Sequence, residues 1–194
     1  MKKIISSTFL LLTSILCNSQ NVMNYLETPS VIKFDNQDYN LVWSTHPNQT
    51  YYKQEYLPKG QNLEKFKNMV TIDFLKGDLK VSDFVNQKIA ELQNAKKYNP
   101  IVNYNVLEKG DEIILDFLMT VNSKDGKKVM VAERNIYRYI KLQNEKTKGL
   151  LLFSMSERAY DNEIETFFNS LKKDKNSLIN NVANLKIPEV NPKI

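Results

Sequence analysis

Cysteine and histidine are almost absent from this 194-residue chain, which has one of each, Cys17 and His46. Cys17 lies in an N-terminal segment that we expect to be removed or lipidated, so the mature chain should have no disulfide and no thiol nucleophile. A zinc site would have to combine His46 with carboxylates alone, unlike the usual ligand sets rich in histidine or cysteine. The sequence therefore predicts no metal and no other cofactor.

Arginine is also scarce, and the formal charge of the whole chain is only +5. Two of the lysines belong to the N-terminal segment, so the mature chain is less basic still. The other lysines are scattered among acids and asparagines, whereas a nucleic-acid-binding protein usually has a concentrated basic face. We therefore expect no nucleic-acid partner.

One long apolar run occurs, Ile4–Leu16, and it follows two lysines. It is too short for a stable transmembrane helix, and its position is typical of a secretory signal, so residues 1–19 are predicted to be a signal peptide. Small residues precede the expected cleavage between Ser19 and Gln20. The alternative is a lipid anchor on Cys17, but such cysteines usually follow a small residue and Leu16 stands there. We expect a secreted or periplasmic protein with no transmembrane helix in the mature chain.

Four strand-like segments follow one another between residues 101 and 158 and form the centre of the predicted fold. They are rich in β-branched and aromatic residues, and turn-forming residues separate them, which predicts an antiparallel meander. Further strands are expected at residues 31–35, 40–45, 50–57 and 69–75. The third of these is largely polar, as in an edge or outer strand.

Helical spacing of apolar residues begins after Ser82, a predicted N-cap, and continues to Ala95, before an Asn-Pro pair at residues 99–100. A second helical region begins at Asp161, and one or two helical turns are predicted after Asn62. The fold class is therefore α+β, with an antiparallel sheet (meander 101–158 plus N-terminal strands) flanked by helices near 82–98 and 161–184. We expect a polar leader at 20–30, a single domain at 31–186 and a tail at 187–194.

The order of strands and helices is similar to that of the Mog1/PsbP-like α/β/α sandwich proteins, a likeness of architecture that implies no function. Residues 55–60 read E-Y-L-P-K-G and precede Phe66 and Met69. This stretch resembles uncharacterised secreted bacterial proteins that share an E-Y-x-P-x-G turn followed by an aromatic residue and Met. The resemblance covers Tyr51–Leu75, and it implies a structural connection but no activity.

The third strand of the meander contains the main candidate site. Strand alternation places Arg134 and Arg138 on an otherwise apolar face, where an unpaired charge would be very costly. Antiparallel pairing should bring Glu133 and Arg134 opposite Glu157 and Arg158. The cluster could bind an anion, or its arginines could form structural ion pairs, which we expect. The candidate ligand-binding residues are Arg134, Arg138, Tyr137, Glu133, Glu157 and Arg158.

Other residues suggest catalysis less directly. Ser44 and His46 share a strand face, but side chains two residues apart are about 7 Å from each other, and no G-x-S-x-G motif occurs. Asp73 and Asp116 lie inside apolar strands, where burial can raise the pKa of a carboxyl group. Asp116 has the more apolar neighbours on its own face.

We interpret the protein as a secreted or periplasmic, non-catalytic domain that binds an unknown small ligand, a protein partner or an envelope component. No residue is predicted to be catalytic. The alternative is a carboxylate-dependent hydrolase that uses Asp116, Glu133 and Glu157. A third hypothesis is an envelope-interaction protein anchored through Cys17.

Overall fold

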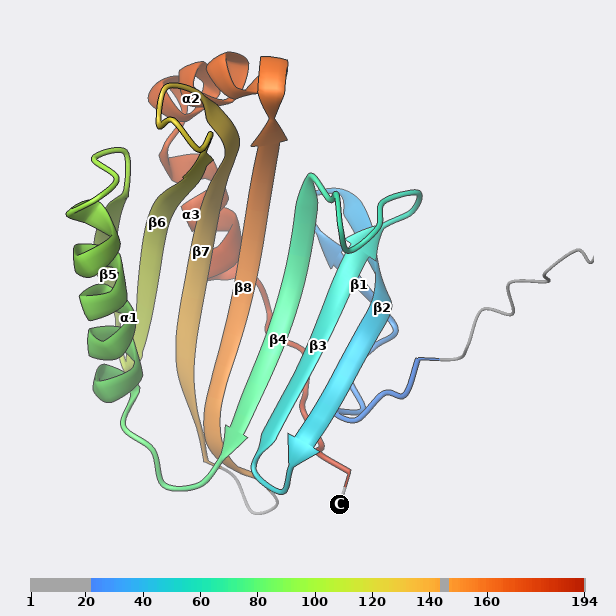
Figure 1. Cartoon of the computed structure of the whole chain (residues 1–194). Helices are drawn as coiled ribbons and strands as arrows, with labels where there is room; N and C mark the ends of the chain where they lie inside the picture. Colours follow the sequence, from blue (N-terminus) through green and yellow to red (C-terminus); the bar gives the residue numbers. More distant parts are fainter. Residues whose placement is uncertain (1–21, 144–146, 194) are drawn as a thin grey trace, which may run out of the picture.

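The computed structural model describes residues 22–143 and 147–193, which form one eight-stranded antiparallel sheet with helices on both faces (Figure 1). The predicted signal peptide, Cys17 and part of the last hairpin loop lie outside the described residues. The strands are β1 (Val31–Phe34), β2 (Gln37–Asn48), β3 (Tyr51–Pro58), β4 (Asn68–Lys76), β5 (Asn103–Lys109), β6 (Glu112–Asn122), β7 (Val129–Gln143) and β8 (Lys148–Tyr160). The helices are α1 (Val81–Lys96), the short 3₁₀ turn η1 (Asp161–Glu163), α2 (Ile164–Lys173) and α3 (Asn176–Asn184).

The sheet has the order β1-β2-β3-β4-β8-β7-β6-β5. Strands β5 to β8 form the predicted meander, and β4 pairs with β8 so that the N-terminal strands extend the same sheet. The α+β class is confirmed, with a fold dominated by its sheet. Strands β1 and β5 are the two edges.

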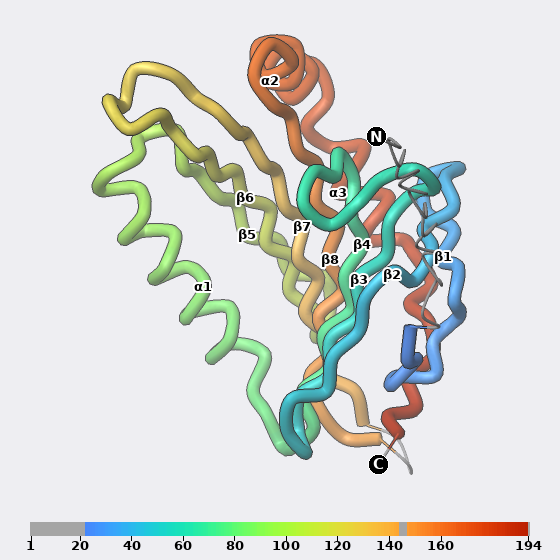
Figure 2. The backbone as a smooth tube through the Cα atoms, turned by 45° about the vertical axis from the view of Figure 1, so that its right-hand side comes forward, coloured from blue at the N-terminus to red at the C-terminus, as the bar shows by residue number. Residues whose placement is uncertain are grey.

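Helix α1 covers one face of the sheet at β5, β6 and β7 (Figure 2). Its buried residues Val85 and Leu92 pack in a cluster with Leu115 and Phe117 of β6. The helix begins at Val81, with Lys80 as the N-cap residue and no side-chain cap, so the predicted cap at Ser82 was wrong.

Helices α2 and α3 lie on the opposite face (Figure 2). On α3, Ile179 and Val182 pack in a cluster with Ile136 and Ile140 of β7. The predicted leader before β1 and the predicted tail after α3 also contribute to this face. Leu26 and Val190 are buried there, and the Asn191 amide donates to the Leu26 carbonyl, so both segments pack against the sheet.

Two predictions about the N-terminal half of the chain, one about a helix and one about a strand, were wrong. No helix follows Asn62: residues 63–65 form bends, and the Asn62 carboxamide accepts a hydrogen bond from the Lys65 amide instead. Strand β3 is an inner strand, between β2 and β4. Its polar residue Gln54 is fully buried because Thr28 and Asn24, distant in sequence, supply hydrogen-bond partners.

Gly149 in β8 is required by close packing against β4. A Cβ atom at this position would lie 2.6 Å from the Phe74 ring and would also collide with the Leu75 carbonyl oxygen. Because backbone and a buried ring cannot both move aside, we expect Gly149→Ala to lower the free energy of unfolding by about 1–3 kcal/mol, the range for overpacked cores. Urea unfolding measures this change.

Gly126→Ala is the matched control, because that glycine lies in an open turn where an added Cβ atom would have no neighbour within 4 Å. Its positive φ of 71° should cost about 1 kcal/mol. A Gly149→Ala protein as stable as the wild type would contradict the packing argument.

Candidate functional site

A cavity of about 480 Å³ lies between the outer strands of the meander and the two C-terminal helices. Helices α2 and α3 pack mainly against β7 and β8, so β5 and β6 have little helical cover on that face. We call this cavity the β5–α3 pocket. It is lined by Ile101, Asn103, Tyr104, Asn105, Asp116, Phe117, Leu118, Arg134, Phe168, Leu171, Lys172, Lys175, Asn176 and Ile179.

The floor of the β5–α3 pocket holds a buried ion pair. Arg134 is only 4% exposed. Its guanidinium donates to both carboxylate oxygens of Asp116, at 2.9 and 3.1 Å, and to the Lys175 carbonyl at 2.6 Å. Such a two-pronged contact is among the stronger arginine–carboxylate geometries. The pair leaves the floor close to neutral.

The walls of the pocket are apolar, and its rim is cationic. Phe168 and Leu171 of α2 face Leu118 of β6 across the cavity. Lys172 and Lys175 stand at the junction of α2 and α3, where both are exposed. Neither lysine forms a side-chain ion pair within the described part of the chain, so their charges are available to a ligand.

Arg138 forms a second buried pair further along β7. Its guanidinium donates to both oxygens of Glu112, at 2.7 and 3.1 Å. It also donates to the Val182 and Leu185 carbonyls at the C-terminal end of α3. Cations stabilise this end of a helix, because its last carbonyls have no partner within the helix. Arg138 therefore joins the end of α3 to the sheet.

Strands β7 and β8 bring Glu133 and Arg134 opposite Glu157 and Arg158, as predicted, and the register places Glu133 opposite Arg158 and Arg134 opposite Glu157. Side-chain pairing follows it only in part. Arg158 pairs with Glu133, but the partner of Arg134 is Asp116 of β6. Sequence reasoning missed that partner because it compared β7 with β8 and not with β6.

The six candidate residues divide between the two faces of the sheet. Arg134, Arg138 and Glu157 lie on the face towards α3, whereas Glu133, Arg158 and Tyr137 lie on the α1 side. There the Arg158 guanidinium lies 4.0 Å from the centre of the Phe66 ring. Tyr137 packs edge-on against Phe117 in the α1-side cluster. These residues do not form one anion site, and their role in ligand binding stays a prediction.

The carboxylates considered for hydrolysis are separated in the same way. Asp116 and Glu157 share the α3 face with Arg134, whereas Glu133 lies on the opposite face. Burial raises the pKa of Glu157, while the nearby Arg134 charge lowers it and Asp35 raises it. The three carboxylates therefore do not converge on one reaction centre.

His46 contributes to packing at the end of β2. Its imidazole stacks on Tyr52 with ring centres 3.9 Å apart, and its Nδ1 lies 3.0 Å from the Tyr51 carbonyl oxygen. The buried hydroxyl oxygen of Ser44 has no hydrogen-bond partner among the residues that the structure describes. His46 is therefore engaged with β3, consistent with a structural residue at a strand end.

Asp73 of β4 is the carboxyl group with the more perturbed environment, contrary to the expectation that favoured Asp116. Burial raises its pKa above the ordinary value, and the hydroxyl of Tyr51, which donates at 2.5 Å, opposes that rise together with the charge of Lys53. Burial also raises the pKa of Tyr51. The Asp116 carboxylate, by contrast, is paired with the guanidinium of Arg134.

Neither a metal cluster nor a membrane helix is found in residues 22–143 and 147–193. No group of three or more histidine, cysteine, aspartate or glutamate side chains in these ranges could hold a metal ion. No helix within them is long and apolar enough to cross a membrane.

The chain belongs to an uncharacterised bacterial protein family, whose model matches residues 26–187. The match includes all eight strands, the three α-helices and every residue that lines the β5–α3 pocket. No curated protein and no solved structure matches the chain.

Asp73 should make stability depend on pH. Its pKa is raised in the folded state, so folding binds a proton and stability falls as pH rises from about 3.8, the ordinary value, through the raised value. Asp73→Asn carries no charge and should be the more stable protein at pH 7 to 8. The difference should shrink as pH falls towards 4, and each unit of pKa shift corresponds to about 1.4 kcal/mol.

Urea unfolding between pH 3.5 and 8 measures this difference. Tyr51→Phe is the companion variant, because losing the hydroxyl donor should raise the pKa of Asp73 further and steepen the decline of stability with pH. A difference between Asp73→Asn and wild type that stays constant across the range would rule out titration of this carboxyl group.

Proposed function

We propose that the protein is an exported, non-catalytic binding domain whose β5–α3 pocket holds a ligand with an apolar body and an anionic group. One observation carries the proposal: an apolar cavity of about 480 Å³ opens beneath Lys172 and Lys175, two exposed lysines with no acidic partner among the described residues. Ligand pockets in proteins commonly have this size and are mostly apolar, with a few polar groups that orient the ligand.

The distribution of charge supports an anionic ligand. At the floor, Asp116 compensates Arg134, so burying an apolar group against this pair requires little desolvation of free charge. At the rim, Lys172 and Lys175 keep a positive charge that no described acid neutralises. An amphipathic anion would place its apolar part against Phe168 and Leu171 and its charge beside the lysines.

Binding is favoured over hydrolysis by the surroundings of the carboxylates. The guanidinium of Arg134 occupies both oxygens of Asp116, which leaves this carboxylate poorly placed to take a proton from water. Glu157 lies beside the same arginine rather than across an open space. We therefore retain the hydrolase only as the weaker alternative.

The proposal has two further parts, a likeness in architecture and membership among secreted bacterial proteins. The layered architecture fits the first, and the family match fits the second. Helices on both faces of one sheet agree with the likeness to Mog1/PsbP-like α/β/α sandwiches, which we keep as a proposal about architecture alone. The E-Y-L-P-K-G stretch lies inside the matched region 26–187 and fits membership among secreted bacterial proteins.

A fluorescent probe with the required chemistry tests the pocket. We expect 8-anilinonaphthalene-1-sulfonate to bind at one saturable site, and Leu118→Trp to weaken binding at least tenfold because the indole fills the cavity. Lys172→Glu with Lys175→Glu should weaken it about tenfold by reversing the charge of the rim. Fluorescence titration and calorimetry measure both effects.

Matched controls lie outside the pocket. Val121→Trp adds the same ring to an exposed position of β6, and Lys59→Glu with Lys76→Glu makes the same change of charge near the ends of β3 and β4. Both controls should bind the dye as the wild type does. An equal loss of dye affinity in the test and control variants, or the absence of a saturable site, would contradict the proposal.

Export is tested at the N-terminus of the protein made in its bacterial host. Mass spectrometry should find a mature chain that starts at Gln20, because the predicted signal ends at Ser19. Processing should also be insensitive to globomycin, which blocks removal of lipoprotein signals. A diacylated N-terminus at Cys17, or an intact Met1, would contradict this proposal.

A further inference from the structure

We infer that the ligand of the β5–α3 pocket is an extended peptide, which pairs with the free edge of β5 and places an apolar side chain in the pocket. The inference rests on the proposed function and names the class of ligand. Three observations support it: an unprotected sheet edge, a cavity continuous with that edge, and lysines beside it that no described acid neutralises.

Strand β5 is the last strand of the sheet and presents an open edge. Its seven residues pair with β6 without a bulge, from Asn103 opposite Leu118 to Lys109 opposite Glu112, and none of the seven is buried. No backbone hydrogen bond from another described segment reaches residues 103–109 on the outer side. The edge can therefore accept a further strand.

Proteins usually protect such edges with short strands, prolines, bulges or lysines. The opposite edge strand, β1, is short, with four residues. Strand β5 has no proline and a single lysine, Lys109, whose ammonium group donates to the Ala183 carbonyl at the end of α3 and so is drawn away from the edge. An extended peptide can add to an exposed edge of this kind through main-chain hydrogen bonds.

The pocket begins at the same edge. Asn103 and Asn105 of β5 share the face that lines the cavity, and the cavity continues past β6 to Arg134 of β7. A strand added to β5 would lie about 4.8 Å further out and would point alternate side chains towards this face. One of them would enter the cavity between Leu118 and Phe168, which gives the peptide its apolar anchor.

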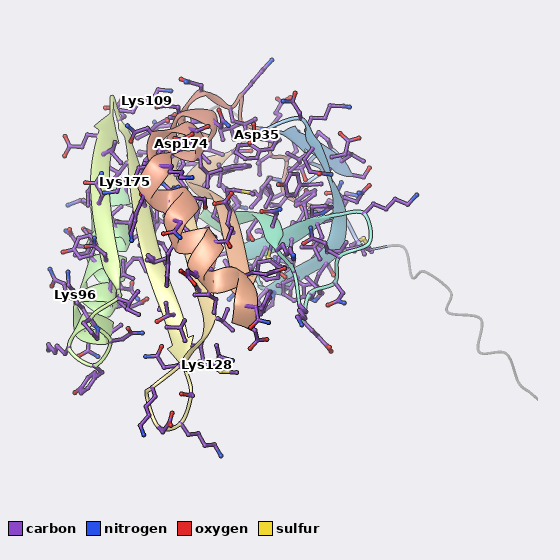
Figure 3. All side chains as sticks on the ribbon, turned by 90° about the horizontal axis from the view of Figure 1, so that it is seen from above. Asp35, Lys96, Lys109, Lys128, Asp174 and Lys175 are labelled. Atoms are coloured by element: carbon purple, nitrogen blue, oxygen red, sulfur yellow. The ribbon has the colours of Figure 1, made fainter. Side chains whose placement is uncertain are left out.

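The junction of α2 and α3 supplies the complementary charge. Figure 3 shows Asp174 and Lys175 at this junction, on the side of the helices towards β5. The Asp174 carboxylate already has partners, because it accepts hydrogen bonds from the Asn176 and Ser177 amides at the start of α3. Lys172 and Lys175 remain available. A carboxylate close to the apolar anchor, either acidic side chain or chain terminus, fits this rim.

The test is selection from random dodecapeptides displayed on phage, with the intact mature protein as bait. We expect enriched peptides to combine a large apolar residue with a nearby carboxylate. A synthetic copy should displace 8-anilinonaphthalene-1-sulfonate and should bind Leu118→Trp at least tenfold more weakly than Val121→Trp. N-methylation of alternate backbone nitrogens should weaken binding at least tenfold in one of the two registers.

Amide hydrogen exchange locates the peptide independently of affinity. Bound peptide should slow exchange in residues 103–109 more than in β1, the other edge. Failure to enrich peptides, protection outside β5, or binding that tolerates N-methylation in both registers would overturn the inference. If the dye still binds and Leu118→Trp still weakens its binding at least tenfold, the proposed function survives without the peptide.

Discussion

The burial of two arginines under α3 is the constraint on which the site depends. A guanidinium that is 4% or 7% exposed requires a carboxylate and further acceptors, because an unpaired buried charge would cost several kcal/mol. Arg134 finds them in Asp116 and the Lys175 carbonyl, and Arg138 in Glu112 and the Val182 and Leu185 carbonyls. These contacts tie both ends of α3 to β7.

The pocket follows from this attachment. Because α3 is held along β7 and α2 continues over β7 and β8, the outer strands β5 and β6 keep a face without a covering helix. The apolar side chains of the helices border that face, and the turn between α2 and α3 presents its lysines there. In our proposal the ligand binds beside the ion pairs and not to their charged groups, because those charges are already paired.

The two faces of the sheet differ in how their buried charged groups are compensated. On the α3 face Arg134 and Arg138 are paired with carboxylates and covered, while burial raises the pKa of Glu157. On the α1 side, Asp73 has a raised pKa that Tyr51 and Lys53 only partly offset, and Glu133 pairs with Arg158. A strand pattern cannot distinguish these cases, because alternation assigns a residue to a face but does not say what covers that face.

The sequence by itself determined the strands of the meander, the two helical regions and the antiparallel pairing that brings Glu133 and Arg134 opposite Glu157 and Arg158, since these depend on local periodicity and on hairpins. It also indicated that Arg134 and Arg138 needed partners. Only the tertiary structure decided that Asp116 and Glu112 are those partners, that Thr28 allows Gln54 to be buried in an inner strand, and that α3 leaves a pocket beside β5. These features join residues far apart in the chain, and their geometry depends on how the helices pack on the sheet, which local patterns do not encode.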